Sequence, residues 1–359
     1  MEQFQNTPEM LDLIPQPAFC VQSGMIIKVN PAATAFLIET GTHIQSFLHT
    51  GAEEYAAFTG GCLYLTLLIN DQTIGASVSR IQDLDVFCLE PEQSDVHLQA
   101  MALAARELRE PLGNIMAVTD RLFPETAQAD PVKQEQVSII NRSLYQMLRI
   151  ICNMSDAGLY TAHTGSRQEI RDICAVLNDI FGRAALLTEQ ASVSLHYTGC
   201  SETVYTMMDA QKVERMVFNI LSNALKFTPA GGRIDAALIR RERKLYLSIC
   251  DSGSGIADNL KGTLFSRYLR APGLEDSRHG IGLGMVLIRS VAALHGGTVL
   301  IDQPEGCGTR ITVSFSIRHG DASVRSPGFR IDYAGERDHG LLELSDVLPA
   351  HLYDTDTIN

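Results

Sequence analysis

The sequence predicts a multidomain α+β protein, and three patterns along the chain support this fold class. Residues 8–92 carry short strand-like apolar runs around a helical segment. Residues 93–160 carry two stretches with apolar residues at spacings of three and four, which is typical of packed helices. Residues 169–318 mix amphipathic helices with alternating strands, which indicates an α/β sandwich with helices over one face of a sheet. An acidic, turn-rich tail, 319–359, follows.

Composition and charge narrow the function classes. The 359 residues are 45% hydrophobic and 20% charged, as in ordinary globular proteins, and the formal net charge is −13. That charge disfavours nonspecific binding to nucleic acid or to an anionic membrane. No apolar run approaches the roughly 18 residues that span a bilayer, and the first residues lack the pattern of a signal peptide. We therefore expect a cytoplasmic protein without membrane insertion.

The eight cysteines are scattered along the chain, and no two have CxxC or metal-ligand spacing. In the cytosol such cysteines are ordinarily reduced. We therefore expect buried free thiols, with neither a disulfide nor a cysteine-ligated metal ion.

The first unit, 8–92, is expected to be a small sensor domain. Ser23-Gly24 separates two strand-like runs, a helical "PAATAFLIE" follows, and Asn70-Asp71 punctuates three further strand-like runs. This order, together with Asn30-Pro31-Ala32 closing the second strand, resembles a PAS sensor domain. An unrelated small α+β domain is the alternative.

The second unit, 93–160, is expected to be a helical hairpin with two apolar seams. Asp130 is a plausible N-cap and Pro131 a first helical residue for the second helix. One hairpin buries little by itself, so we expect two copies to close a four-helix bundle as a homodimer. The seam residues are Leu98, Met101, Ala105, Leu108, Leu112, Ile115, Thr119 and Leu122 in the first helix, and Val137, Ile140, Leu144, Met147, Ile151 and Met154 in the second.

Four motifs in the third unit, 169–318, predict a nucleotide site. In "NILSNALKFTPAGG", amide oxygens of one helix face could complete the shell of Mg²⁺, and a lysine there could meet phosphate. "DSGSGIA" places a carboxylate at a strand end, before glycines that let a ligand approach the backbone. The candidate residues of these two motifs are Asn219, Asn223, Lys226, Asp251, Gly253 and Gly255.

The other two motifs are rich in glycine. "HGIGLGMVLIRSVAALHGG" places Gly280, Gly282 and Gly284 at the start of a helix, where free amides and the helix dipole favour phosphate. "GCGTRITVSF" places Thr309 before the last strand. Each motif alone is weak, because a glycine triplet often marks only a tight turn. The four in this order indicate one binding site.

The third unit resembles the ATP-binding domain shared by histidine kinases, gyrase B and related chaperones. The resemblance implies that Asn223 ligates Mg²⁺ with support from Asn219. It also implies that Asp251 accepts a hydrogen bond from the adenine amino group, with Thr309 and a water as further members of that contact. The lid of the family would then be "LFSRYLRAPGLEDSRHG", with Phe265, Arg267 and Arg270 in its F-box region. The ATPases of this superfamily carry a Glu where Asn219 stands, so phosphate transfer or plain binding is favoured over rapid hydrolysis.

The resemblance extends to the hairpin, but the nucleophile is missing. The family box reads His-Glu-apolar-Arg-(Thr or Asn)-Pro-Leu, and here it reads "RELREPL", with Arg106 at the histidine position. A guanidinium stays protonated and has no lone pair with which to attack a γ-phosphate. Glu107 stands where the family keeps its acid/base carboxylate, and Glu110 replaces the residue that orients water for dephosphorylating a partner. Pro111 breaks a helical pattern at the place where the family bends this helix.

The sequence therefore predicts a histidine-kinase-like signalling protein that binds ATP and Mg²⁺ and has lost ordinary autophosphorylation, a pseudokinase. His97 and His163 are candidate substitute acceptors, although surface histidines without a catalytic task are the better interpretation. The chain could instead be an active kinase that uses another acceptor. It could also phosphorylate an intact histidine kinase in trans, and a response regulator is a further expected partner.

Overall fold

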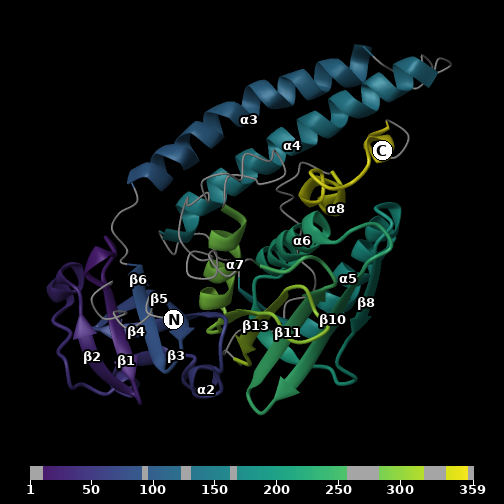
Figure 1. Cartoon of the computed structure of the whole chain (residues 1–359). Helices are drawn as coiled ribbons and strands as arrows, with labels where there is room; N and C mark the ends of the chain where they lie inside the picture. The colour runs from purple at the N-terminus through teal and green to yellow at the C-terminus, as the bar shows by residue number, and fades with distance from the viewer. Residues whose placement is uncertain are drawn as a thin grey trace.

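The computed structural model describes residues 11–90, 96–122, 131–161, 168–256, 283–318 and 337–354. Figure 1 shows the N-terminal strands at one end of the molecule and the strands and helices of residues 169–318 beside them. A long helical hairpin lies across the top, and the C-terminal segment lies between this hairpin and the helices below it.

The N-terminal unit is an antiparallel sheet in the order β2-β1-β6-β5-β4, with β3 paired to β4. Asn70 and Asp71, with φ of 51° and 60°, form the tight turn between β4 and β5. The segment expected to be a helix after β2 is a 3-10 helix, which ends where Leu37 adopts a left-handed conformation. The elements are η1 (Leu11–Leu13), β1 (Ala18–Gln22), β2 (Met25–Val29), η2 (Pro31–Phe36), η3 (Ile44–Ser46), β3 (Leu48–Thr50), α2 (Ala52–Ala56), β4 (Cys62–Ile69), β5 (Gln72–Ile81) and β6 (Leu84–Glu90).

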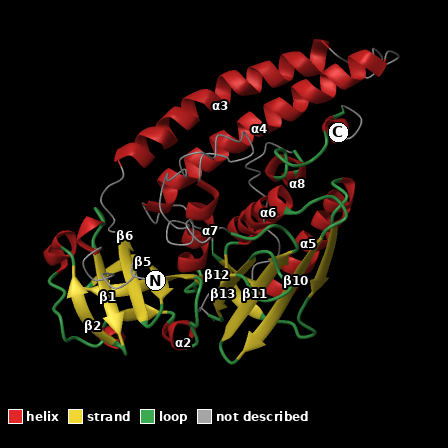
Figure 2. Ribbon diagram, viewed as in Figure 1, coloured by secondary structure: helices red, strands yellow, loops and turns green. Residues whose placement is uncertain are grey.

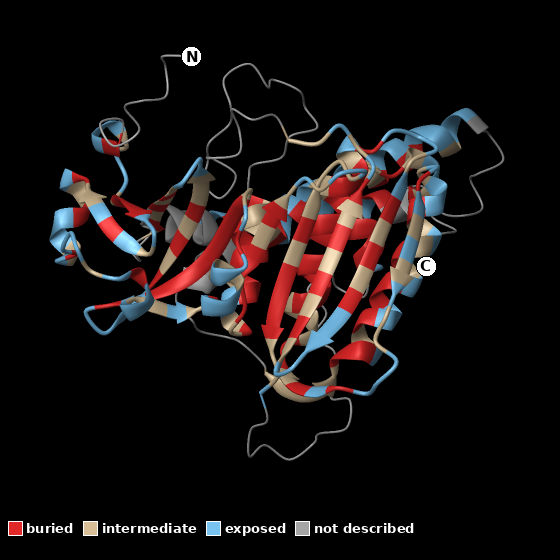
Figure 3. Ribbon diagram, turned by 60° about the horizontal axis from the view of Figure 1, so that its bottom comes forward, coloured by how far each residue is buried: buried red, intermediate tan, exposed pale blue. Residues whose placement is uncertain are grey.

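Residues 168–318 form the expected sandwich, with helices over one face of a sheet (Figure 2). Buried and partly exposed residues alternate along the strands (Figure 3), because one face of each strand meets the helices. The elements are β7 (Glu169–Asp172), α5 (Ile173–Gln190), β8 (Ser194–Thr198), β9 (Tyr205–Met208), α6 (Ala210–Phe227), β10 (Arg233–Arg241), β11 (Lys244–Asp251), α7 (Leu283–Leu294), β12 (Val299–Asp302) and β13 (Arg310–Ser316).

The two strand units join into one sheet, which the sequence did not predict. β4 pairs antiparallel with β12, with Leu63 opposite Leu300. Gly61 permits this junction, because a Cβ there would lie 2.3 Å from the carbonyl oxygen of Ile301. Lys244 adds an ion pair to Glu54, at 2.8 Å, across the same junction. The N-terminal unit is therefore packed directly against the third unit.

The hairpin consists of α3 (Val96–Leu122) and α4 (Pro131–Thr161), and α3 continues through Pro111. The side chains of Leu98, Met101 and Leu122 are not described, and Met154 is partly buried; the other predicted seam residues divide into two sets. Ala105, Leu112 and Thr119 in α3, with Val137, Leu144 and Ile151 in α4, are buried. The intervening Leu108, Ile115, Ile140 and Met147 are 50%, 52%, 38% and 44% exposed. One heptad position thus packs within the chain, and the other presents apolar side chains to solvent.

The expectation that all cysteines are free thiols is wrong for one pair. Cys250, at the end of β11, and Cys307, in the turn before β13, form a disulfide across a sequence separation of 57. The pairing of Cys250 with Arg310 in the β11–β13 ladder brings these segments together. Spacing along the chain could not show this proximity. The other six cysteines are free.

The C-terminal segment, residues 337–354, contains α8 (His339–Glu343) and η6 (Ala350–Tyr353). Asp338 caps α8 by accepting a hydrogen bond from the Leu341 amide, at 2.8 Å. Tyr353 is fully buried against Tyr145 of α4, with ring centroids 5.2 Å apart. Within the described ranges, none of the helices is long and apolar enough to cross a membrane.

Candidate nucleotide-binding site

Helix α6 carries the first set of candidate residues, and its start is fixed by buried polar groups. The Asp209 side chain caps the helix by accepting from the Lys212 amide, at 3.2 Å. The Asp209 amide in turn donates to Nε2 of buried His295, at 3.1 Å, while Nδ1 of His295 contacts the carbonyl of Val291, at 2.7 Å. Only the neutral Nδ1–H tautomer satisfies both contacts. Burial and the nearby cations lower the pKa of His295.

Asn219 lies in the buried interior of the site, with 2% of its surface exposed. Its Nδ2 donates to the carbonyl of Arg215, at 2.9 Å, and to Oε2 of Glu343, at 3.3 Å. Its Oδ1 faces the start of α7, where a Cβ on Gly284 would lie 3.0 Å away. The structure thus brings together the first asparagine of one predicted motif and the last glycine of another. Asn223 follows one turn later and is partly exposed.

Asp251 forms the second centre of the site, at the end of β11. Its Oδ1 accepts from the amides of Gly253, at 2.9 Å, and Thr309, at 3.1 Å. Neither of these two amides bonds to Oδ2. A Cβ on Gly308 would lie 2.6 Å from Oδ1, so only glycine fits there. Burial raises the pKa of Asp251, although the two amide bonds act in the opposite direction. Gly255, with φ of 73°, continues the turn.

Lys226 lies in the last turn of α6, close to a second cation, Arg149. Its Nζ donates to Oδ2 of Asp346, at 3.1 Å. Burial and neighbouring Arg149 lower the pKa of Lys226 despite the attraction of that carboxylate. An ammonium with these neighbours is well suited to hold an anion.

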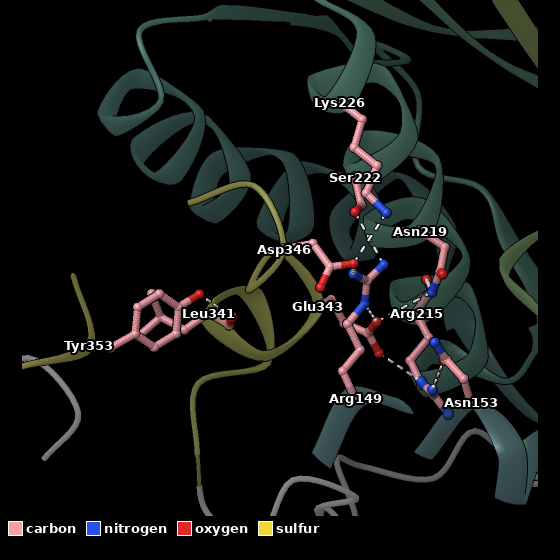
Figure 4. A network of polar contacts seen from close by, with 10 residues as sticks. All are labelled: Arg149, Asn153, Arg215, Asn219, Ser222, Lys226, Leu341, Glu343, Asp346 and Tyr353. Atoms are coloured by element: carbon pink, nitrogen blue, oxygen red, sulfur yellow. Dashed lines mark hydrogen bonds and ion pairs between the residues drawn. The ribbon is translucent and has the colours of Figure 1, made fainter. Parts of the chain in front are cut away.

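Four charged residues lie beside Asn219 and Lys226 (Figure 4) and were not predicted from the sequence: Arg149, Arg215, Glu343 and Asp346. Arg215 lies one turn before Asn219 on α6, and that spacing was a usable signal. Arg149 donates to Ser222 of α6, at 3.1 Å, but it comes from α4. Because α4 belongs to the hairpin and not to the third unit, the motifs of the third unit could not indicate it. The two acidic residues come from the tail, where nothing in the local sequence indicates their destination.

Five predicted residues, Phe265, Arg267, Arg270, Gly280 and Gly282, lie outside the described residues, as does His163. Arg106 belongs to α3, but its side chain and that of His97 are not described. Glu107 and Glu110 are exposed on the same helix. Arg109 donates to the sulfur of Cys152 on α4, at 3.3 Å. The "RELREPL" segment thus lies on α3 of the hairpin, and its described charged residues, Glu107, Arg109 and Glu110, are exposed.

Residues 208–319 match the family model of the histidine kinase-, DNA gyrase B- and HSP90-like ATPases. This segment contains every described residue of the predicted nucleotide site. The chain carries a histidine-kinase-type ATPase domain. Domains of this family bind ATP.

Two relatives extend the likeness beyond this domain. Hybrid signal transduction histidine kinase D of Dictyostelium discoideum is 28% identical over 229 residues, which are 62% of this chain and 15% of that protein. Histidine protein kinase DivJ of Caulobacter vibrioides is 28% identical over 222 residues, 60% of this chain and 37% of that protein. The chain thus spans well under half the length of either relative.

A solved structure supports the fold. Full-length ShkA in complex with AMPPNP matches 62% of this chain and 46% of its own with a TM-score of 0.50, at 19% sequence identity. This likeness shows a shared fold alone. It extends over more of the chain than the ATPase domain.

Proposed function

We propose that this chain is a cytoplasmic, histidine-kinase-like signalling protein that binds Mg-ATP and does not autophosphorylate. The observation that carries the proposal is the paired arrangement of Asp251 with Gly253 and Thr309, and of Asn219 with Gly284. The first group offers a buried carboxylate oxygen that can accept from the adenine amino group. The second offers an amide oxygen and a helix start, which suit Mg²⁺ and phosphate.

The same site has no carboxylate at position 219 that could activate water, and the hairpin has no imidazole at position 106. An arginine there cannot accept the γ-phosphoryl group, because its protonated nitrogens have no available lone pair. Binding without transfer is the simplest outcome of both facts. The nucleotide then acts as a ligand that biases the protein between conformations.

The exposed set of the hairpin seams supports a homodimer. Leu108 and Ile115 of α3, with Ile140 and Met147 of α4, present apolar side chains where a second hairpin would complete a four-helix bundle. In the N-terminal unit, the order of two strands, short helices with the short strand β3 among them, and then β4, β5 and β6 supports a PAS-like sensor. Direct contact of that unit with the ATPase domain, through the shared sheet, gives sensing a short route to the nucleotide site.

A second candidate is a subunit that phosphorylates an intact histidine kinase in trans. Exposed Glu107 favours it, because the acid/base carboxylate is retained although the neighbouring nucleophile is gone. The two candidates can be separated by mixing the protein and ATP with a histidine kinase that keeps its phosphoacceptor histidine but has an inactivated ATP site. Label on the partner's histidine supports transfer in trans, and its absence supports a pseudokinase.

The test of the main proposal is calorimetry of the full-length protein with ATP, with and without Mg²⁺. We expect saturable binding of one nucleotide per chain that requires Mg²⁺. Absence of binding in every variant, including those with a released tail described below, would contradict the proposal.

A further inference from the structure

We infer that the C-terminal segment, residues 337–354, is an internal inhibitor that fills the phosphate half of the nucleotide site. The carboxylates of Glu343 and Asp346 bind the groups that would otherwise hold the phosphates and their metal ion (Figure 4). This inference rests on the proposed function, because it assigns the occupant of the same site when nucleotide is absent.

Glu343 is completely buried and uses both of its oxygens. Oε1 accepts from Nε of Arg215, at 2.9 Å, and Oε2 accepts from Nδ2 of Asn219, at 3.3 Å. Arg149 completes the cluster, with its Nε 3.5 Å from Oε2. A buried carboxylate needs such partners, since an unpaired charge in the interior is costly. The tail therefore supplies the anion that two buried guanidinium groups require.

Asp346 engages the other end of the same helix face. Its Oδ2 accepts from Nη1 of Arg149, at 2.5 Å, and from Nζ of Lys226, at 3.1 Å. Burial alone would raise the pKa of Asp346, but these cations outweigh it and the pKa lies below its ordinary value. The two acidic residues are three apart, so one turn of chain spans both ends of the predicted phosphate site. Asp251 is bound by Gly253 and Thr309 instead, in the adenine half.

Further contacts fix the position of the segment on α4. Arg142 donates to the carbonyls of Ser345, at 3.0 Å, and Asp346, at 3.2 Å, and Gln146 adds a bond to Ser345, at 3.1 Å. The amide of Asn141 donates to the carbonyl of Tyr353, at 3.0 Å. These bonds hold the backbone between the two acidic residues, at Asp346 itself and after it, so the carboxylates are presented in one register.

A second anchor lies at the start of α8. His339 Nδ1 lies 2.8 Å from Oε2 of Glu214, and Oε1 of the same carboxylate accepts from Nη2 of Arg183, at 2.5 Å. Gly340 packs so closely that a Cβ would lie 2.4 Å from Leu187. The segment is thus held by both α5 and α6 before it reaches the site.

Phosphates and these carboxylates cannot occupy the site together. Both are anions that need Asn219, Lys226 and the neighbouring guanidinium groups, and their like charges repel. ATP can therefore bind only when the tail is released. The apparent dissociation constant of ATP then equals the intrinsic constant divided by the fraction of protein molecules with a released tail. A tail docked in nine molecules of ten would weaken binding about tenfold.

The test compares Mg-ATP affinity, by calorimetry, among full-length variants. Asp346→Asn and Glu343→Gln each remove one competing charge, and we expect each to bind at least about tenfold more tightly than the parent. Glu343→Gln also leaves buried guanidinium groups without their anion, so its fold is checked by circular dichroism. Arg142→Ala loosens the tail without altering any group proposed to touch nucleotide, and it should tighten binding too. Glu135→Gln, which removes an exposed carboxylate of α4, is the control for charge and should match the parent.

A reciprocal measurement reads the tail itself. By linkage, saturating Mg-ATP should speed hydrogen exchange of the amides of residues 337–354 in the parent protein. Equal affinity in the parent, Asp346→Asn and Arg142→Ala, or slower exchange on adding nucleotide, would overturn the inhibitor and leave nucleotide binding intact. No binding in any of these proteins would overturn both the inhibitor and the proposed function.

Discussion

The Asp251→Asn variant tests the assignment of the adenine half of the site. In the parent, Oδ1 is committed to the amides of Gly253 and Thr309, so Oδ2 is the atom available to accept from the adenine amino group. In the variant, the asparagine oxygen can keep both amide bonds, and its NH₂ group then takes the place of Oδ2. A donor would then face the donor of the adenine amino group at a residue that is only 6% exposed in the parent. The fold should survive while the contact with adenine is lost.

The magnitude follows from the cost of a buried polar group without a partner, about 1–3 kcal/mol. At about 1.4 kcal/mol per tenfold, ATP should bind about 5- to 150-fold more weakly. The measurement is calorimetry in the parent and again in the Asp346→Asn background, where the tail competes less. Inorganic triphosphate serves as a ligand control, because it lacks adenine and should bind both proteins equally. Unchanged ATP affinity in both backgrounds would refute the assignment of this pocket.

Three further predictions concern other parts of the chain. The Leu108→Asp, Ile140→Asp double variant should be monomeric by light scattering at micromolar concentration while the parent is dimeric, because both side chains belong to the exposed seam; a variant that stays dimeric would place the interface elsewhere. Arg106→His should gain some acid-labile phosphate, because it restores an imidazole beside Glu107; no gain would mean that more than the nucleophile has been lost. The free energy of unfolding should fall as the pH drops below about 6.5, because the unfolded chain protonates His295 before the folded chain, whose His295 pKa is lowered, can do so. His295→Gln should remove that part of the pH dependence in urea titrations, and an unchanged pH profile would contradict the neutral tautomer.

Much of the local structure was accessible from the sequence because short-range patterns determine it. Strand alternation and the glycine positions placed Asp251 at the end of a strand and Gly284 at the start of a helix, and the structure has both. The heptad spacing placed the two long helices. It could not show that Leu112 packs inside the hairpin while Leu108 is exposed, since both satisfy the same pattern.

What the sequence could not show depends on contacts between distant segments. The pairing of β4 with β12 joins strands more than 200 residues apart, and backbone bonds of that kind leave no local signature. The Cys250–Cys307 disulfide has the same origin. The position of Glu343 among Arg149, Arg215 and Asn219 depends on two helices, α4 and α6, meeting one tail. In the acidic, turn-rich tail, "GLLELSDVLPAHLY" was the part that could dock, but its sequence did not show which surface it would cover.

The most direct test of the central claim is incubation of the purified protein with Mg²⁺ and γ-labelled ATP, scoring bound nucleotide and covalent label separately. The account predicts bound nucleotide, increased by Asp346→Asn, and no acid-labile phosphate on the unaltered chain, because the guanidinium at position 106 cannot attack. Phosphate mapped by mass spectrometry to His97 or to another residue of the hairpin would contradict it.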